Sequence, residues 1–139
     1  MAPLDFAIAA AFGQAALTFW AIVHLGRARL RAIVAGPIPL ADIARTTEAY
    51  PEAVRRLDAN LRNQFETPVL FFAALALAAA LGAGGWIFAV AAWGYLASRV
   101  VHRVIHIGRN DVRRRFQAFS AGLVALLVMW IVLGIELLL

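Results

Sequence analysis

The stretch 62-RNQFETPVLFF-72 places three polar side chains directly before an apolar run. Arg62, Asn63 and Glu66 can each make specific polar contacts, and Pro68 stands between them and the apolar residues that follow. A helix that only has to lie in lipid has no use for such residues, because ionisable groups are costly in the hydrocarbon region. The stretch therefore indicates a membrane helix that carries a polar site where the aqueous phase ends.

The composition around this stretch is that of an integral membrane protein. Of 139 residues, 63% are hydrophobic, and the mean hydropathy of +0.80 excludes an ordinary soluble globule. Four apolar segments reach the roughly 20 residues that a helix needs to span a bilayer. We therefore predict one all-α domain, an up-down bundle of four transmembrane helices at about 4–26, 51–83, 85–108 and 112–139, the second kinked at Pro68.

The thirteen arginines fall into two groups, at 27–62 and 99–115, and lysine is absent. Both ends of the chain and the turn 82-GAGG-85 carry no arginine. Because basic connections stay inside, we expect the loops 27–50 and 108–112 to be cytoplasmic and both termini extracytoplasmic. This distribution assigns the net charge of +5 to the membrane surface rather than to a nucleic-acid partner. Arginine without lysine, with abundant alanine, favours a bacterial inner membrane.

Polar residues of the second and third predicted helices gather on one face each. Arg62, Asn63 and Glu66 follow one another at helical spacing on the second. On the third, four residues fall within an arc of about 100°; they are Arg99, His102, Arg103 and His106. Ionisable residues inside the apolar boundary face a bundle interior or a wet cavity and are candidates for a functional site.

Simpler interpretations compete with a binding site. Arginines at helix ends usually snorkel to headgroups; those to which this applies are Arg27, Arg31, Arg45, Arg56, Arg109 and Arg114. Arg62 and Glu66 could form a purely structural pair. His102 and His106 have the i, i+4 spacing of two metal ligands, but the surrounding arginines disfavour a divalent cation, so no metal site is predicted.

The charge pattern also describes the ligand that such a site would take. Because cations outnumber anions, the ligand should carry several negative charges, with one positive charge for Glu66. Glutathione fits, since it has two carboxylates, one ammonium group and a thiol that a nearby cation helps to ionise. The chain has no cysteine, so any thiol must come from the ligand.

Nearly the whole chain resembles the MAPEG family, the membrane-associated proteins of eicosanoid and glutathione metabolism. The segments that carry the resemblance are 26-GRARLR-31, 62-RNQFETP-68, 99-RVVHRVIHIG-108 and Arg115. The motif Arg-Asn-x-x-Glu followed by proline and aromatic residues is the most specific of them. The resemblance implies a homotrimer of four-helix bundles that holds glutathione between neighbouring subunits near the cytoplasmic side, in contact with membrane lipids and a lipophilic substrate.

The resemblance implies roles for particular residues as well. The glutathione-binding residues expected from the matching motifs are Arg29, Arg62, Asn63, Glu66, Arg99, His102 and His106. Arg115 matches the arginine that stabilises the glutathione thiolate in catalytic members, and it is the expected catalytic residue. A cation near the sulfur favours the thiolate, which is the nucleophilic form.

Three positions depart from the family pattern. His106 stands where glutathione-using relatives often have tyrosine, and Phe116 and Phe119 stand where some catalytic relatives have a serine and a tyrosine. The function expected is a membrane glutathione transferase or glutathione-dependent peroxidase that acts on lipophilic electrophiles. The alternative is a non-catalytic MAPEG-like membrane protein that binds a lipid or an anionic metabolite in the same pocket.

Overall fold

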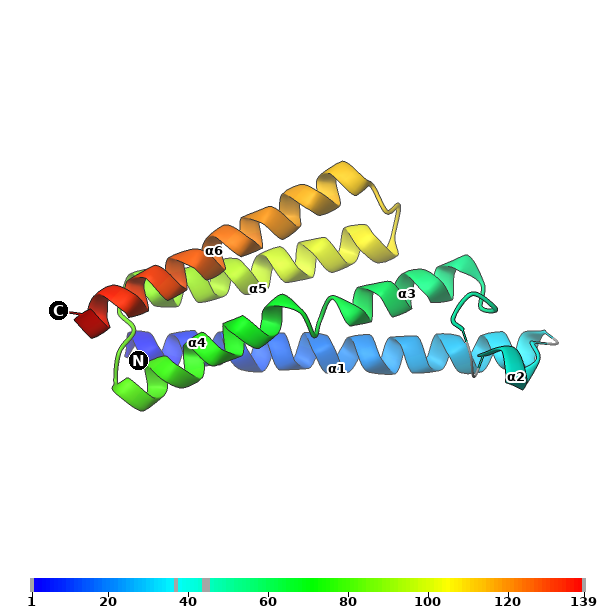
Figure 1. Cartoon of the computed structure of the whole chain (residues 1–139), viewed down its shortest axis with the longest axis horizontal. Coiled ribbons are helices and arrows are strands. Elements are labelled where there is room, and N and C mark those ends of the chain that lie inside the picture. Colours follow the sequence, from blue (N-terminus) through cyan, green and yellow to red (C-terminus); the bar gives the residue numbers. More distant parts are fainter. Residues whose placement is uncertain (1, 37, 44–45, 139) are drawn as a thin grey trace.

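The computed structural model describes residues 2–36, 38–43 and 46–138, and the regular structure within them is helical. The helices are α1 (Pro3–Ala35), α2 (Leu40–Ile43), α3 (Glu52–Arg62), α4 (Thr67–Leu81), α5 (Trp86–Ile107) and α6 (Val112–Leu138). The long helices run along a common axis (Figure 1), with both termini at one end of the bundle and α2 at the other. The arginine-bearing connections lie toward the α2 end, which we call the arginine-rich end.

The first helix is longer than the sequence indicated. We predicted that it ends near residue 26 and that a loop follows from 27 to 50, but α1 continues to Ala35 and α2 adds one further turn. The segment 27-RARLRAIVA-35 contains no glycine or proline, and arginine, leucine and alanine favour the helix. The helix ends at Gly36, which adopts an extended conformation. Pro37, Ala44 and Arg45 of the predicted loop lie outside the described residues.

The second predicted helix, at 51–83, is interrupted. Its first part, α3, ends at Arg62, and α4 begins at Thr67 after a short non-helical segment. Pro68 explains the interruption, since it has no N–H and its ring would clash with the carbonyl of Gln64, four residues earlier. Proline is tolerated in the first turn of a helix, which is the position it takes in α4. The kink predicted at Pro68 is therefore a break at 63–66.

The most extensive packing joins α5 and α6, and α5 also packs against α1 and α3. Small residues permit this close packing, as is usual between membrane helices. A Cβ at Gly122 of α6 would overlap Ser98 of α5, and the Phe71 ring of α4 stacks on Tyr95 of α5 at 4.6 Å between centroids. The core that results is apolar toward the terminal end of the bundle, and polar residues of α5 are buried toward the other.

Among the described residues, three segments are long and apolar enough to cross a membrane: α1, α3 with α4, and α6. The fourth predicted span, α5, has 22 residues, or about 33 Å at 1.5 Å per residue. Its mean hydropathy is lowered by the polar stripe that begins at Arg99, which faces the interior of the bundle. Large hydrophobic side chains instead cover the outer surface of the helices, where lipid would contact them.

Candidate ligand-binding site

A cavity of about 580 Å³ opens between α3, α5 and α6 near the arginine-rich end. Its lining combines cations, one carboxylate and aromatic side chains; the residues are Ala59, Arg62, Asn63, Glu66, His102, His106, Val112, Arg115, Phe116 and Phe119. Six of the eight residues expected at a glutathione site therefore line one cavity. The other two, Arg29 and Arg99, lie outside its lining.

The break between α3 and α4 shapes one wall of this cavity. Asn63 and Glu66 both lie between the two helices, but they differ in backbone conformation. Asn63 keeps helical backbone angles as the C-cap of α3, whereas Glu66 departs from the helix that the sequence predicted. The Asn63 carbonyl accepts a hydrogen bond from Nη2 of Arg99 at 2.6 Å. Arg99 thus satisfies a backbone acceptor near the place where the helical hydrogen-bond ladder is interrupted.

Arg99 lies directly behind the cavity lining. Its side chain is buried, with 1% of the residue exposed, and its guanidinium lies 5.9 Å from the centre of the Phe119 ring. Among the described residues, its Nε and Nη1 atoms have no hydrogen-bond partner. Unpaired donors on a buried cation are unfavourable, so this position favours an anionic group nearby.

Two histidines of α5 form the floor of the cavity. The rings of His102 and His106 lie 5.5 Å apart between centroids and nearly perpendicular, at 80°. Both residues are buried, and the Phe119 ring packs against His102 with 5.9 Å between ring centroids. Nδ1 of His102 has no partner among the described residues. Within those residues no group of three or more histidine, cysteine or acidic side chains is arranged to hold a metal ion.

Arg115 enters the cavity from the first turn of α6. Its Nη1 donates to Oδ1 of Asn110 at 2.7 Å. Asn110 has a positive φ of 52°, a conformation that asparagine tolerates better than most residues. The tight connection between α5 and α6 therefore holds the Arg115 side chain beside the cavity, with its other donors available.

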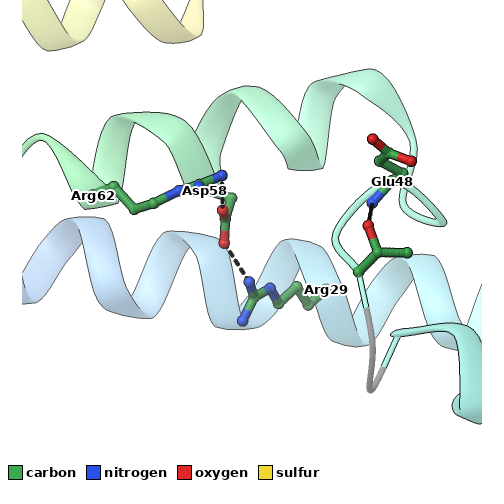
Figure 2. Close-up of polar contacts among 5 residues, drawn as sticks. Arg29, Glu48, Asp58 and Arg62 are labelled. Atoms are coloured by element: carbon green, nitrogen blue, oxygen red, sulfur yellow. Dashed lines mark hydrogen bonds and ion pairs between the residues drawn. The ribbon is translucent and has the colours of Figure 1, made fainter.

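Asp58 of α3 connects two of the expected site residues (Figure 2). It pairs with Arg29 of α1 and, at 2.9 Å, with Arg62 one turn further along α3. The structural Arg62–Glu66 pair considered from the sequence is therefore not formed, and among the described residues Glu66 takes part in no ion pair. Asp58 was missed, although its i, i+4 spacing to Arg62 could have identified it.

A second set of polar residues joins α1, α3 and α5, and we call it the buried polar cluster. It comprises the buried residues Asn60, Arg103 and His106, with the partly exposed His24 at its edge. Arg103, which is 1% exposed, donates to Oδ1 of Asn60 and contacts Nδ1 of His24 at 3.3 Å. Its guanidinium lies 4.2 Å from the centre of the Trp20 ring. Asn60 was not identified from the sequence, because the sequence does not show which neighbour a polar residue meets.

The arrangement is that of an integral membrane protein whose apolar helices enclose a cationic cavity at one end. The MAPEG family model matches residues 7–135, nearly the whole chain, and the chain belongs to this family. Comparisons with curated proteins and with solved structures give no significant match. Membership of the family associates the chain with glutathione-related or eicosanoid metabolism in membranes.

Proposed function

We propose that this protein is a membrane glutathione transferase or glutathione-dependent peroxidase that acts on lipophilic electrophiles. The observation that carries the proposal is the single cavity that brings Arg62, Glu66, His102 and Arg115 together. Its volume of about 580 Å³ lies within the range typical of small-molecule sites. Members of the MAPEG family generally use glutathione, and this charge pattern matches a ligand with two carboxylates and one ammonium group.

Different residues of the cavity would bind different groups of the ligand. Arg62 and His102, which line the cavity, would hold carboxylates, and the positive charge of Arg99 would act on them from behind the lining. Glu66, which has no ion-pair partner among the described residues, would hold the ammonium group. The buried cation of Arg99 favours an anionic ligand through its charge, because its unpaired N–H groups are buried and Arg99 lies outside the lining. Asn63 would add a neutral polar contact from the same wall.

Bound glutathione would supply the thiol that this cysteine-free chain lacks. Arg115 would stabilise the sulfur anion, because a nearby cation favours thiolate over thiol. The sulfur would then attack the electrophile, forming a carbon–sulfur bond while the leaving group departs with the bonding electrons. Phe116 and Phe119 line the same cavity and offer an apolar surface to a lipophilic substrate.

The proposal includes a homotrimer in a bacterial inner membrane, with the arginine-rich end in the cytoplasm. The cavity is open on one side, since the Arg62 side chain is 70% exposed and Phe116 is 67% exposed. A neighbouring subunit would close that side, and Arg29, which lies outside the lining, would then serve a neighbour's ligand or only its own Asp58. Crosslinking in native membranes should give trimers, and a monomer that binds glutathione would contradict this assembly.

The same cavity supports a second candidate, a non-catalytic binder of a lipid or an anionic metabolite. The observation in its favour is that Phe116 and Phe119 line the cavity with apolar rings and supply no hydroxyl group to a bound sulfur. Such a protein would hold the anion by the same arginines without activating a thiol.

Ultraviolet difference absorbance on the purified protein in detergent separates the two candidates. Adding glutathione at neutral pH should produce the absorbance band of a thiolate, and S-methylglutathione, which has no ionisable thiol, is the matched control. A band with glutathione alone supports the transferase or peroxidase. Binding of glutathione by calorimetry without the band would support the non-catalytic binder, and failure to bind would reject glutathione as the ligand.

A further inference from the structure

Within the buried polar cluster, Arg103, Asn60 and His106 form a chain of hydrogen bonds, and Arg103 determines which atoms donate. Arg103 contacts Oδ1 of Asn60, and Nδ2 of Asn60 lies 3.4 Å from Nδ1 of His106. Asn60 is fully buried, and its side chain lies between the arginine and the histidine. His106 in turn lines the ligand cavity, whereas Asn60 and Arg103 do not.

A guanidinium has only donors, so the Asn60 atom that meets Arg103 must be the amide oxygen. The amide nitrogen of Asn60 then faces His106, and an amide nitrogen can only donate. Nδ1 of His106 must therefore be the acceptor and carry no proton. The same reasoning makes Nδ1 of His24 an acceptor from Arg103.

A neutral imidazole whose Nδ1 is an acceptor has its proton on Nε2. Nε2 of His106 makes no hydrogen bond to the described residues. It is also not one of the fully buried polar atoms that lack a partner among them. It is therefore accessible from the cavity that His106 lines. A donor at this position would suit an anionic atom of the ligand, as a tyrosine hydroxyl would.

We infer that Asn60 is a positioning residue: it holds His106 as the neutral Nε2–H tautomer, so that His106 donates a hydrogen bond into the ligand cavity. Arg103 also contributes, because its hydrogen bond to Oδ1 of Asn60 keeps the amide in the orientation that directs Nδ2 toward His106. Only the identity of the ligand rests on the proposed function. The direction of the Asn60–His106 contact follows from the buried polar cluster itself.

Nitrogen NMR of the full-length protein in detergent, with ¹⁵N in its histidine rings, tests the inference. The chain has three histidines, and His24→Gln and His102→Gln proteins assign the signals. The ¹⁵N shifts separate protonated from unprotonated ring nitrogens. At neutral pH, His106 should have a bare Nδ1 and a protonated Nε2, and a proton on Nδ1 would overturn the inference.

Asn60→Asp reverses the contact with almost no change in shape. The carboxylate still accepts from Arg103 but can only accept from His106, so Nδ1 of His106 should gain a proton. Asn63→Asp is the matched control, because it adds the same charge at the cavity wall without a hydrogen bond to His106 among the described residues. A bare Nδ1 in the Asn60→Asp protein, or the same change in the control, would overturn the inference.

Measurements of glutathione affinity give a second test, which does not depend on whether the Asn60→Asp protein folds. The amide nitrogen of glutamine reaches close to the position of Nε2, whereas that of asparagine does not. Glutathione affinity should therefore be nearly retained in His106→Gln and fall about tenfold in His106→Asn, the loss of one hydrogen bond to a charged group. Equal losses would count against the inference. If the wild type does not bind glutathione, the proposed function fails, and the ring signals still decide the tautomer.

Discussion

Replacement of Asp58 by asparagine should loosen the attachment of α3 to α1. Asp58 pairs with Arg29 on α1 and with Arg62 on its own helix, and its side chain is only 12% exposed (Figure 2). The asparagine side chain would keep the shape and one acceptor but remove the charge. The two arginines would then face each other across a neutral group.

The exposure of each partner sets the size of the effect. The Arg62 side chain is 70% exposed, so its pair with Asp58 belongs to the class of surface pairs that contribute about 0–1 kcal/mol. Breaking a fully buried ion pair costs roughly 3–5 kcal/mol of stability. The Arg29 side chain is 38% exposed, so solvent screening reduces the expected cost of losing its pair with Asp58 to about 1–2 kcal/mol. We expect a total loss of about 2 kcal/mol, or a fall in Tm of about 8 °C.

Thermal unfolding of the purified protein in one detergent, followed by circular dichroism, measures this change. Asp111→Asn is the matched control, because Asp111 pairs at 3.5 Å with an Arg114 side chain that is 75% exposed; its Tm should move by about 2 °C at most. A double-mutant cycle with Arg29→Gln should return a coupling energy of about 1–2 kcal/mol between Asp58 and Arg29. A coupling near zero, or equal Tm shifts in the Asp58 and Asp111 variants, would refute the reasoning.

The remaining predictions concern the ligand and the membrane. Glu66→Gln should weaken glutathione binding about ten- to a hundredfold by calorimetry, through the loss of one charge-assisted contact of about 1.5–3 kcal/mol, and should leave the thiolate band per bound ligand unchanged. Arg115→Ala should abolish that band and turnover at neutral pH while glutathione still binds; an undiminished band would show that Arg115 does not act on the sulfur. Reporter fusions after residue 139 should be active outside the cytoplasm, and a cytoplasmic signal would reverse the expected orientation.

The membrane class, the family and most of the helices could be read from the sequence. Hydrophobic run length decides whether a segment can span lipid, and this property belongs to the segment alone. The polar motif around Arg62 and Glu66 identified the family that the family model confirms. Six expected site residues meet at one cavity. Helical periodicity placed His102 and His106 on a common face before any neighbour was known, whereas Arg115 was expected from the family resemblance.

The tertiary structure decided which faces meet and which polar groups satisfy one another. Periodicity could not show that Asp58 joins α3 to α1, that Arg99 lies behind the cavity rather than in it, or that Arg103 orients the amide of Asn60 toward His106. These contacts join residues between 29 and 46 positions apart in the chain. Their partners are set by how the helices pack, because a buried polar group pairs with the donor or acceptor that packing brings within reach.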